Sequence, residues 1–168
     1  MDKIEELKGI LLSDGRITWV DASDYDWLRQ WKWHTTKSTN TIYASRNINS
    51  NNGRKTLLMH RLILGLMSDT ECDHIDGNGL NNRRSNLRPC SHQQNAFNAK
   101  IYRKTSSEFR GVSWRKGTDK WAAYIKFNGQ QIHLGFFADE VDAARAYNGA
   151  AMKYFGVFAH LNNTGGSK

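Results

Sequence analysis

The stretch CDHIDGNGLNNRRSNLRPC, residues 72–90, gathers side chains that can bind metal ions and move protons. Asp73 and His74 are adjacent, and a second aspartate, asparagines and arginines follow closely. A divalent ion that polarises a phosphate takes oxygen ligands from carboxylates and amides. Histidine is the natural base for activating water near neutral pH. These residue types therefore suit the hydrolysis of a phosphodiester.

Two other interpretations of this stretch are a structural zinc site and a polar surface turn. Structural zinc needs four Cys or His ligands, usually in closely spaced pairs. Cys72 and Cys90 are isolated, and His74 and His92 add no paired spacing. We therefore expect no structural zinc and place both cysteines in the core. A surface turn rich in Asn and Arg is the interpretation that composition alone favours.

A strand, a turn and a helix would have to position these side chains. Adjacent residues of a strand point to opposite faces, which separates Asp73 from His74. The run Asp76-Gly77-Asn78-Gly79 supplies turn chemistry. Ser91-His-Gln-Gln94 fits a capping box, which predicts a helix from about residue 92. That helix can turn Asn95 toward the Asp73 strand, where its amide oxygen would be a second metal ligand.

The longer pattern MHRLILG…DHIDGNGLNNRRSNLRPCSHQQNAFN, within residues 57–98, closely resembles the HNH endonuclease family in its zinc-free phage and homing branch. The resemblance implies a ββα-metal site around one divalent ion, Mg²⁺ or Mn²⁺. By position, Asp73 and Asn95 would be the metal ligands, His74 the general base and Asn86 a brace that orients the histidine. His60 would have a supporting catalytic role, although a hydrogen-bonded structural histidine is an equal alternative. Residues expected to hold the loop are Asp76, Asn78 and Asn82; candidates for phosphate contacts are Arg61, Arg83, Arg84 and Arg88.

Other elements of the first half follow from turn signals and periodicity. Residues 9–20 read as a hairpin around Asp14-Gly15. Residues 21–33 have apolar side chains at helical spacing, with Ser23 or Asp24 as the cap, and their tryptophans are expected in the core. Residues 41–48 predict a strand. The apolar segment 56–66 fits a buried strand or a helix, which periodicity cannot separate.

Residues 108–162 predict a small separate domain. Asn128-Gly129 is a strong hairpin signal between two alternating runs. In the first run one face, Trp121, Ala123, Ile125 and Phe127, should pack, and the other face, Lys120, Ala122, Tyr124 and Lys126, should be exposed. Asp139 can cap a helix that Gly156 stops. The helix residues expected to face the sheet are Val141, Ala144, Tyr147, Ala151 and Tyr154.

This segment strongly resembles the DNA-binding domain of plant ethylene-response factors, the APETALA-type domain, through RGV, KWAAYI, LGFF, DAARAYNGAA and a closing HLN. The resemblance implies a three-stranded sheet backed by one helix, whose free face enters the DNA major groove. Several family contact residues are replaced here, so the plant target sequence does not transfer. The positions expected to contact DNA are Arg110, Arg115, Lys126 and His133, with Lys120 and Tyr124 on the same exposed face.

The positive charge is distributed unevenly along the chain. We divide the chain into a nuclease domain, 1–98, a basic linker, 99–107, and a DNA-binding domain, 108–168. Residues 1–98 carry 13 basic and 11 acidic side chains, whereas residues 99–168 carry 11 and 5, so +6 of the net +8 lies in the second part. A pI near 9.6 fits a polyanionic partner. Linker residues that could follow a phosphate backbone are Lys100, Arg103 and Lys104.

Composition also bears on the compartment of the protein. Two cysteines cannot build a disulfide scaffold, no N-terminal run resembles a signal peptide, and no apolar stretch reaches the ~20 residues that span a bilayer. We therefore expect a cytoplasmic protein without membrane contact, and the resemblance to phage and homing endonucleases implies that it is encoded by a phage or mobile element in a bacterial host.

Together these patterns predict an α+β chain, with an N-terminal ββα-metal nuclease domain and a C-terminal three-stranded antiparallel sheet packed on one helix. The predicted activity is metal-dependent, site-recognising cleavage of double-stranded DNA to 5′-phosphate and 3′-hydroxyl ends. One active site per chain favours a monomer that nicks. The alternative is a DNA-binding transcriptional regulator with an inactive HNH remnant. An RNA-directed protein is a weaker alternative, because the RNA major groove is deep and narrow.

Overall fold

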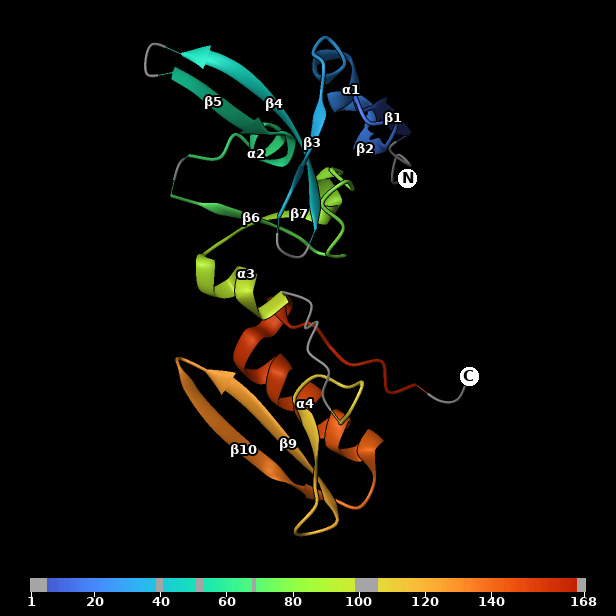
Figure 1. Ribbon diagram of the computed structural model, residues 1–168, viewed down its shortest axis with the longest axis vertical. Coiled ribbons are helices and arrows are strands. Elements are labelled where there is room, and N and C mark those ends of the chain that lie inside the picture. Colours follow the sequence, from blue (N-terminus) through green and yellow to red (C-terminus); the bar gives the residue numbers. More distant parts are fainter. Residues whose placement is uncertain (1–5, 39–40, 51–52, 68, 99–105, 166–168) are drawn as a thin grey trace, which may run out of the picture. The chain divides into compact units, whose positions relative to one another are not determined.

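The computed structural model describes residues 6–38, 41–50, 53–67, 69–98 and 106–165. The chain divides into two compact units, residues 1–96 and 97–168 (Figure 1). Both units mix short strands with a few helices, so the mixed α/β character expected from the sequence is confirmed. Among the described helices none is long and apolar enough to cross a membrane. Most of the predicted linker lies outside the described residues, including Lys100, Arg103 and Lys104.

The first unit begins with the predicted hairpin. Strands β1 (Leu7–Leu11) and β2 (Ile17–Asp21) pair antiparallel around Gly15, whose φ of 84° is easily reached without a side chain. Helix α1 (Ala22–Leu28) is shorter than the helical pattern over 21–33 predicts. The prediction of Ser23 or Asp24 as its cap is wrong: Asp21 is the N-cap residue, and Asp24 lies inside the helix with a buried side chain that binds elsewhere.

A second, three-stranded sheet follows, with antiparallel order β3 (His34–Lys37), β4 (Ile42–Ser50), β5 (Gly53–Leu58). The segment 56–66 contains both of its predicted alternatives, because β5 leads directly into helix α2 (Met59–Leu64). Gly65 ends this helix with a left-handed φ of 61°. Strands β6 (Glu71–His74) and β7 (Leu87–Cys90) then form an antiparallel pair joined by the loop 75–86, which ends in the short 3₁₀ helix η1 (Arg84–Asn86). Helix α3 (His92–Asn98) comes next.

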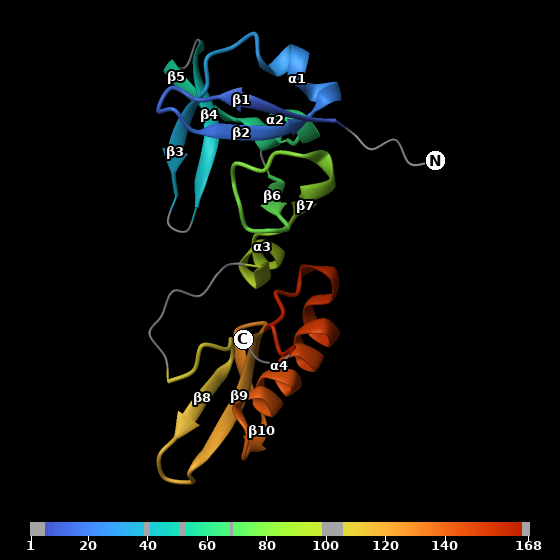
Figure 2. The ribbon, with the colours of Figure 1, turned by 90° about the vertical axis from the view of Figure 1, so that its right-hand side faces the viewer.

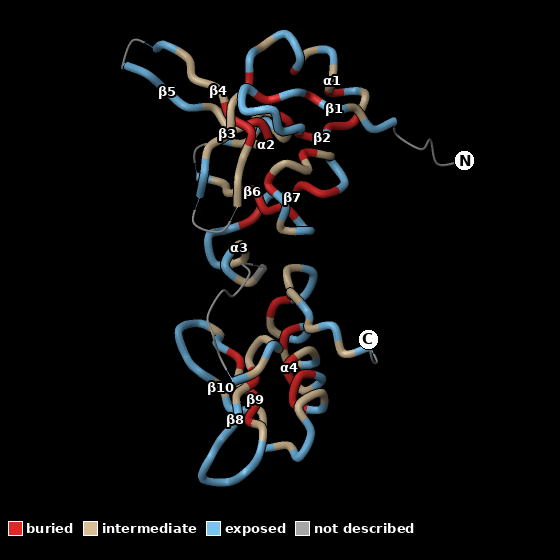
Figure 3. The backbone as a smooth tube through the Cα atoms, turned by 45° about the vertical axis from the view of Figure 1, so that its right-hand side comes forward, coloured by how far each residue is buried: buried red, intermediate tan, exposed pale blue. Residues whose placement is uncertain are grey.

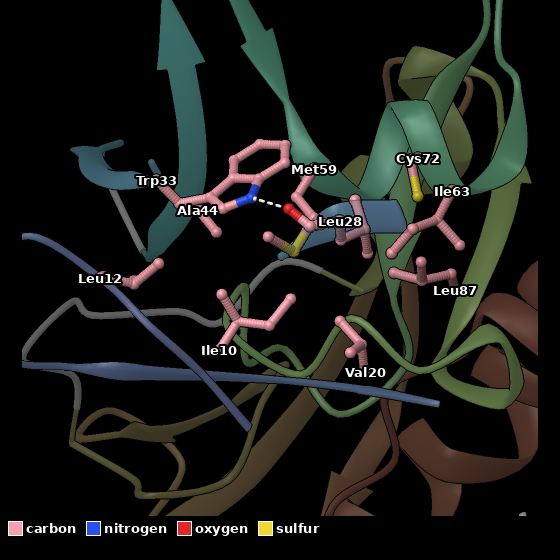
Figure 4. Close-up of a cluster of buried hydrophobic side chains, with 10 residues drawn as sticks. All are labelled: Ile10, Leu12, Val20, Leu28, Trp33, Ala44, Met59, Ile63, Cys72 and Leu87. Atoms are coloured by element: carbon pink, nitrogen blue, oxygen red, sulfur yellow. Dashed lines mark hydrogen bonds between the residues drawn. The ribbon is translucent and has the colours of Figure 1, made fainter. Parts of the chain in front are cut away.

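The core of the first unit is built from several of these elements rather than from one sheet (Figure 4). Trp33 is almost fully buried, and its indole Nε1 donates to the Leu28 carbonyl at 2.9 Å. Met59, Val20 and Leu87 bring α2, β2 and β7 to the same cluster. Figure 3, which colours buried residues red, shows buried backbone in these elements and also in loop segments such as the one that contains Asn82.

The second unit contains strands β8 (Val112–Arg115), β9 (Lys120–Phe127) and β10 (Gln130–Phe137), with β9 in the centre, and helix α4 (Glu140–Phe155) followed by the 3₁₀ turn η2 (Gly156–Phe158). The hairpin predicted at Asn128-Gly129 forms, with φ values of 50° and 80°. The Asp139 side chain caps α4 by accepting from the backbone N–H groups of Val141 and Asp142. Helix α4 packs along one face of the sheet (Figure 2).

Packing in the second unit departs from the sequence pattern in two places. Ala122, assigned to the exposed face of β9, is fully buried, because Ser113 and Phe136 lie beside it on the neighbouring strands. Val141 and Tyr154 of α4 are only partly buried; the buried residues of this helix are Ala143, Ala144, Tyr147, Ala151 and Phe155. Phe97 stacks on Phe155 with ring centroids 4.0 Å apart, which explains why the second unit begins inside α3.

Candidate active site

Strand β6 carries Asp73 and His74, the predicted metal ligand and the predicted general base. Both are buried, with exposed fractions of 5% and 4%. Because neighbours on a strand point to opposite faces, Glu71 and Asp73 share one face, whereas Cys72 and His74 share the other. The strand ends at His74, where a tight turn begins with a bond from Gly77 N to the His74 carbonyl at 2.8 Å. The imidazole therefore stands at the exit of the strand.

On the first face, Asp73 meets Arg88 of the paired strand. The two residues are direct cross-strand partners, and Arg88 Nε donates to Asp73 Oδ2 at 2.7 Å. The Arg88 side chain is 16% exposed, so the ion pair is largely shielded from solvent. Arg88 thus sets the orientation of the carboxylate and balances its charge.

On the second face, His74 lies in a cluster of rings with Tyr43 and His60. The His74 ring centroid is 5.0 Å from that of His60 and 5.6 Å from that of Tyr43. Burial lowers the pKa of His74, although a bond to Asn82 and the nearby carboxylates of Asp76 and Asp73 oppose this effect. The imidazole is therefore held neutral at physiological pH, as a general base requires.

His60 is a buried member of the same cluster. Burial, with the charges of His74 and Arg61, lowers its pKa to about 3. Its Nδ1 is buried without a hydrogen-bond partner among the described residues. This nitrogen therefore gives no support to the alternative of a hydrogen-bonded structural histidine. The supporting role in catalysis stays a prediction.

The loop between β6 and β7 is braced by Asp76 and Asn86. The Asn86 amide donates to Asp76 Oδ1 at 3.0 Å and accepts from the Asp76 backbone N–H at 3.1 Å. Asn81 donates to the second oxygen of the same carboxylate at 2.7 Å. Burial raises the pKa of Asp76, but the bonds from Asn81, Asn78 and Asn86 outweigh it and leave the pKa below its usual value. Asn86 therefore holds the loop that follows His74.

The four arginines proposed for phosphate contact all have partners inside the fold. Arg83 Nε donates to Asp21 Oδ1 at 3.1 Å, and Arg84 donates through Nε and Nη2 to both oxygens of Asp24 at 2.8 and 2.7 Å. Arg61 binds the backbone carbonyls of Thr70 and Met67, ahead of β6. Arg88 binds Asp73. Each arginine thus has a structural role, and contact with phosphate remains a prediction for it.

Helix α3 brings Asn95 to the Asp73 face of β6. The capping box is confirmed, because Gln94 Oε1 accepts from Ser91 N at 2.9 Å and Ser91 Oγ accepts from Gln94 N at 3.2 Å. Asn95 Nδ2 donates to Glu71 Oε2 at 2.7 Å, and His92 Nδ1 lies 2.7 Å from Glu71 Oε1. These bonds lower the pKa of Glu71. With Nδ2 committed to Glu71, the amide oxygen of Asn95 is the atom suited to a metal ion.

The donors on this face fit a hard divalent ion. A carboxylate from Asp73 and an amide oxygen from Asn95 are ligands that Mg²⁺ and Mn²⁺ accept, and such ions keep several waters. In the part of the chain that the structure describes, no three His, Cys, Asp or Glu side chains gather into a metal-binding cluster. Cys72 and Cys90 are buried, which raises the pKa of their thiols to about 12 and 11, so both remain protonated.

The outer face of the C-terminal sheet carries a row of stacked polar and aromatic side chains. Arg115 Nη2 donates to the Tyr124 hydroxyl at 2.6 Å. The Tyr124 ring centroid lies 4.9 Å from that of His133, and His133 lies 4.6 Å from Phe136. Lys120 and Lys126 are exposed on β9. The structure therefore gathers five of the six predicted DNA contacts of this unit on one face.

Arg110 is the exception among those six. Its guanidinium donates through Nη1 to the Phe97 carbonyl at 2.6 Å, and its backbone is bound on both sides by Asn162. Asn148 of α4 in turn holds the Asn162 backbone at 2.7 and 2.8 Å. Arg110 thus joins the start of the sheet to the end of the chain, and a DNA contact from it remains a prediction.

Sequence reasoning missed the parts of the site that come from far along the chain. Tyr43 packs beside both histidines, Glu71 orients Asn95, and Thr18 accepts a bond from Asn82 at 2.7 Å across 64 residues. Local periodicity contains no signal for such pairings. Glu71 is the exception: its position could be inferred from the sequence, because a residue two positions before Asp73 lies on the same face of the strand.

Comparisons with known proteins agree with this geometry. A family model described as HNH endonuclease matches residues 66–97. A protein of Acanthamoeba polyphaga mimivirus, described as the uncharacterized HNH endonuclease L560, is 34% identical over 160 residues, which is 90% of this chain and 79% of the viral protein. APETALA2-like protein 2 of rice is 42% identical over 60 residues, 36% of this chain and 14% of that protein. Protein 3.8 of Escherichia phage T7 is 37% identical over 59 residues, 35% of this chain and 49% of the phage protein.

Proposed function

The chain belongs to the HNH endonuclease family and is a nuclease, and from that premise we propose that it is a divalent-metal-dependent, site-recognising endonuclease of double-stranded DNA. We propose further that it is of the phage or mobile-element homing type and nicks one strand as a monomer. The observation that carries the proposal is that the predicted metal ligands and the predicted base occupy different positions around β6. Asp73 and Asn95 are drawn to one face, while His74 stands neutral at the end of the strand.

Asp73 and Asn95 are the residues that would hold the metal ion. When bound there, a divalent ion supplies electrostatic stabilisation of the phosphate and of the leaving 3′ oxygen. Arg88 keeps the Asp73 carboxylate in one orientation, and Glu71 keeps the amide oxygen of Asn95 turned outward. Such outer partners typically hold ligands in their binding geometry.

His74 is the proposed general base for the attacking water. Its lowered pKa leaves the ring unprotonated and able to accept a proton at neutral pH. Attack of that water on phosphorus, with departure of the 3′ oxygen, leaves 5′-phosphate and 3′-hydroxyl ends. Asn86 acts indirectly, by holding through Asp76 the loop that begins at His74.

The second unit is the proposed DNA reader. Similarity to the rice APETALA2-like protein 2 over 60 residues supports an APETALA-type module in this unit. Arg115, Lys120 and Lys126 give the outer sheet face positive charge, and Tyr124 and His133 give it flat rings. Charge of this kind attracts phosphates, and ring and polar groups contact base edges.

Metal dependence is tested by incubating supercoiled plasmid with the full chain, with and without Mg²⁺ or Mn²⁺. The proposal expects a nicked product that requires the ion. Asp73→Ala should abolish cleavage, and Asn95→Ala and Glu71→Gln should raise the Mg²⁺ concentration needed for half-maximal rate, about 10–100-fold for the outer residue Glu71. Glu108→Gln, in the second unit, is the charge-matched control. Cleavage in excess chelator, or a metal requirement indifferent to Asp73 and Asn95, would refute the site.

A further inference from the structure

The imidazole of His74 has two nitrogens, and only the unprotonated one can act as a base. Which nitrogen carries the proton is decided by what the other one meets. His74 Nε2 lies 3.3 Å from Asn82 Oδ1, and the Asn82 side chain is fully buried. An asparagine amide can present either an oxygen acceptor or an NH₂ donor, so the orientation of Asn82 determines the tautomer.

That orientation follows from a chain of hydrogen bonds that starts at a backbone carbonyl. The Thr18 hydroxyl lies 2.9 Å from the Leu80 carbonyl oxygen and 3.9 Å from Met59 Sδ, and both of these groups can only accept, so its single proton points to one of them. Thr18 Oγ1 can then only accept from Asn82, and it does so from Nδ2 at 2.7 Å. The amide oxygen of Asn82 is thereby turned to His74, and Nε2 must be the nitrogen that donates.

We propose that Asn82, locked by Thr18, is a positioning residue that holds His74 in its Nε2–H tautomer and so assigns Nδ1 as the base. This inference rests on the proposed role of His74 in cleavage. It adds a residue from the N-terminal hairpin to the active site, outside the segment 66–97 that matches the family model.

The backbone of the hairpin supports the same arrangement. Trp19 N donates to the Leu80 carbonyl at 2.9 Å, and Asn82 N donates to the Trp19 carbonyl at 2.8 Å, so two backbone bonds join β2 to the loop 75–86 at the residue after Thr18. Thr18 is fully buried. The Thr18 and Asn82 side chains are shielded from solvent, and a buried donor or acceptor left unpaired is costly. The relay therefore has one low-energy arrangement.

The tautomer itself can be observed in the full-length protein labelled with ¹⁵N. Long-range ¹H–¹⁵N correlation spectra at about pH 8, where an imidazole is neutral, distinguish a protonated from an unprotonated ring nitrogen. The His74 signals are identified by their loss in His74→Ala. We expect Nε2 protonated and Nδ1 unprotonated in the wild-type chain. The opposite assignment would overturn the proposal directly, whatever the cleavage data show.

Two substitutions at position 18 separate the relay from simple packing. Thr18→Val keeps the shape and loses the hydroxyl, whereas Thr18→Ser keeps the hydroxyl and loses a methyl group. The relay predicts that Val slows single-turnover cleavage about 10–100-fold with unchanged DNA affinity and a shifted His74 tautomer. Ser should stay near the wild-type rate. Thr36→Val, which removes another hydroxyl of the same unit bonded to Ser45 at 2.6 Å, is the matched control.

The outcomes are separable. A slow Ser variant beside a fast Val variant would mean that Thr18 acts by packing, and the proposal would be wrong. If His74→Ala still cuts DNA, the general-base role fails while the tautomer measurement still decides the hydrogen-bond relay. If Val is slow and its His74 spectrum contains both tautomers, the relay and the role of His74 are supported together.

Discussion

His60 and His74 sit in one ring cluster, and the burial of His60 has a consequence for acid stability. The folded-state pKa of His60 is about 3, well below the ordinary value of 6.5. Between these values the unfolded chain binds a proton that the folded chain does not. Stability is therefore fully present above about pH 6.5 and is lost as the pH falls toward 3.

This linkage predicts the effect of His60→Phe. The wild-type free energy of unfolding should fall by up to about 1.4 kcal/mol per pH unit for this one histidine below pH 6.5, and the variant should lose that part of the slope. Tyr43→Phe changes the same cluster without removing an imidazole and should retain it. Urea unfolding followed by tryptophan fluorescence at several pH values provides the measurement. An unchanged slope in His60→Phe would show that His60 is not held neutral.

At the scale of elements, much of the fold could be predicted because its signals are local. The capping box at Ser91, the Asp139 cap and the hairpins at Asp14-Gly15 and Asn128-Gly129 each depend on a few adjacent residues. Adjacent Asp73 and His74 could also be assigned opposite faces from the pattern of a strand alone. For the candidate site, the sequence therefore predicts the two key residues and the separation of their side chains.

The rest depends on contacts between distant segments. Aspartate is a common helix N-cap residue, but Asp24 lies inside the helix, where its buried side chain binds Arg84. Ala122 alternates with exposed residues, yet the neighbouring strands cover it. Thr18 gives no local hint that it reaches Asn82. In each case the tertiary neighbour, not the local pattern, decides the environment.

The contact between α1 and the loop 75–86 predicts that two aspartates of this helix contribute very differently to stability. Asp24 is 2% exposed and accepts three bonds, two from Arg84 and one from Trp27 Nε1 at 3.1 Å. Asp26 is 87% exposed and forms an ion pair with Arg29 at 3.3 Å. Asp24→Ala should lower the free energy of unfolding by about 1–2 kcal/mol, because the bonds to Arg84 and Trp27 are lost. The loss is no larger because nearly half of the Arg84 side chain remains in solvent.

Asp26→Ala is the matched control and should change stability by no more than about 0.5 kcal/mol. Chemical denaturation of the two variants beside the wild type measures both values. Equal effects from Asp24 and Asp26 would mean that the ion pair with Arg84 does not anchor the loop.

At the scale of the whole molecule, charge is divided between the two parts of the chain. The nuclease part is nearly balanced, and the excess positive charge lies in the part that we propose as the DNA reader. Arg115 and Lys126 are on the outer sheet face, whereas Arg145 and Lys153 lie on exposed positions of α4, which packs on the other face.

These positions allow a test with two double variants that lose the same net charge. Arg115→Gln with Lys126→Gln should reduce the slope of log Kd against log salt by about 2, because two phosphate contacts are lost. Arg145→Gln with Lys153→Gln should leave the slope unchanged. Titrations of the full chain with its DNA at several salt concentrations decide between the two faces. A larger effect from the helix pair would place the DNA on α4.

The most direct test of the central claim is the rate at which His74→Ala nicks supercoiled DNA in saturating Mg²⁺. If His74 is the base, the variant should cut about 10²–10⁴-fold more slowly than the wild type. It should bind DNA with unchanged affinity, and His34→Gln, a histidine substitution outside the site, should cut normally. A His74→Ala protein that nicks DNA at the wild-type rate would contradict the account.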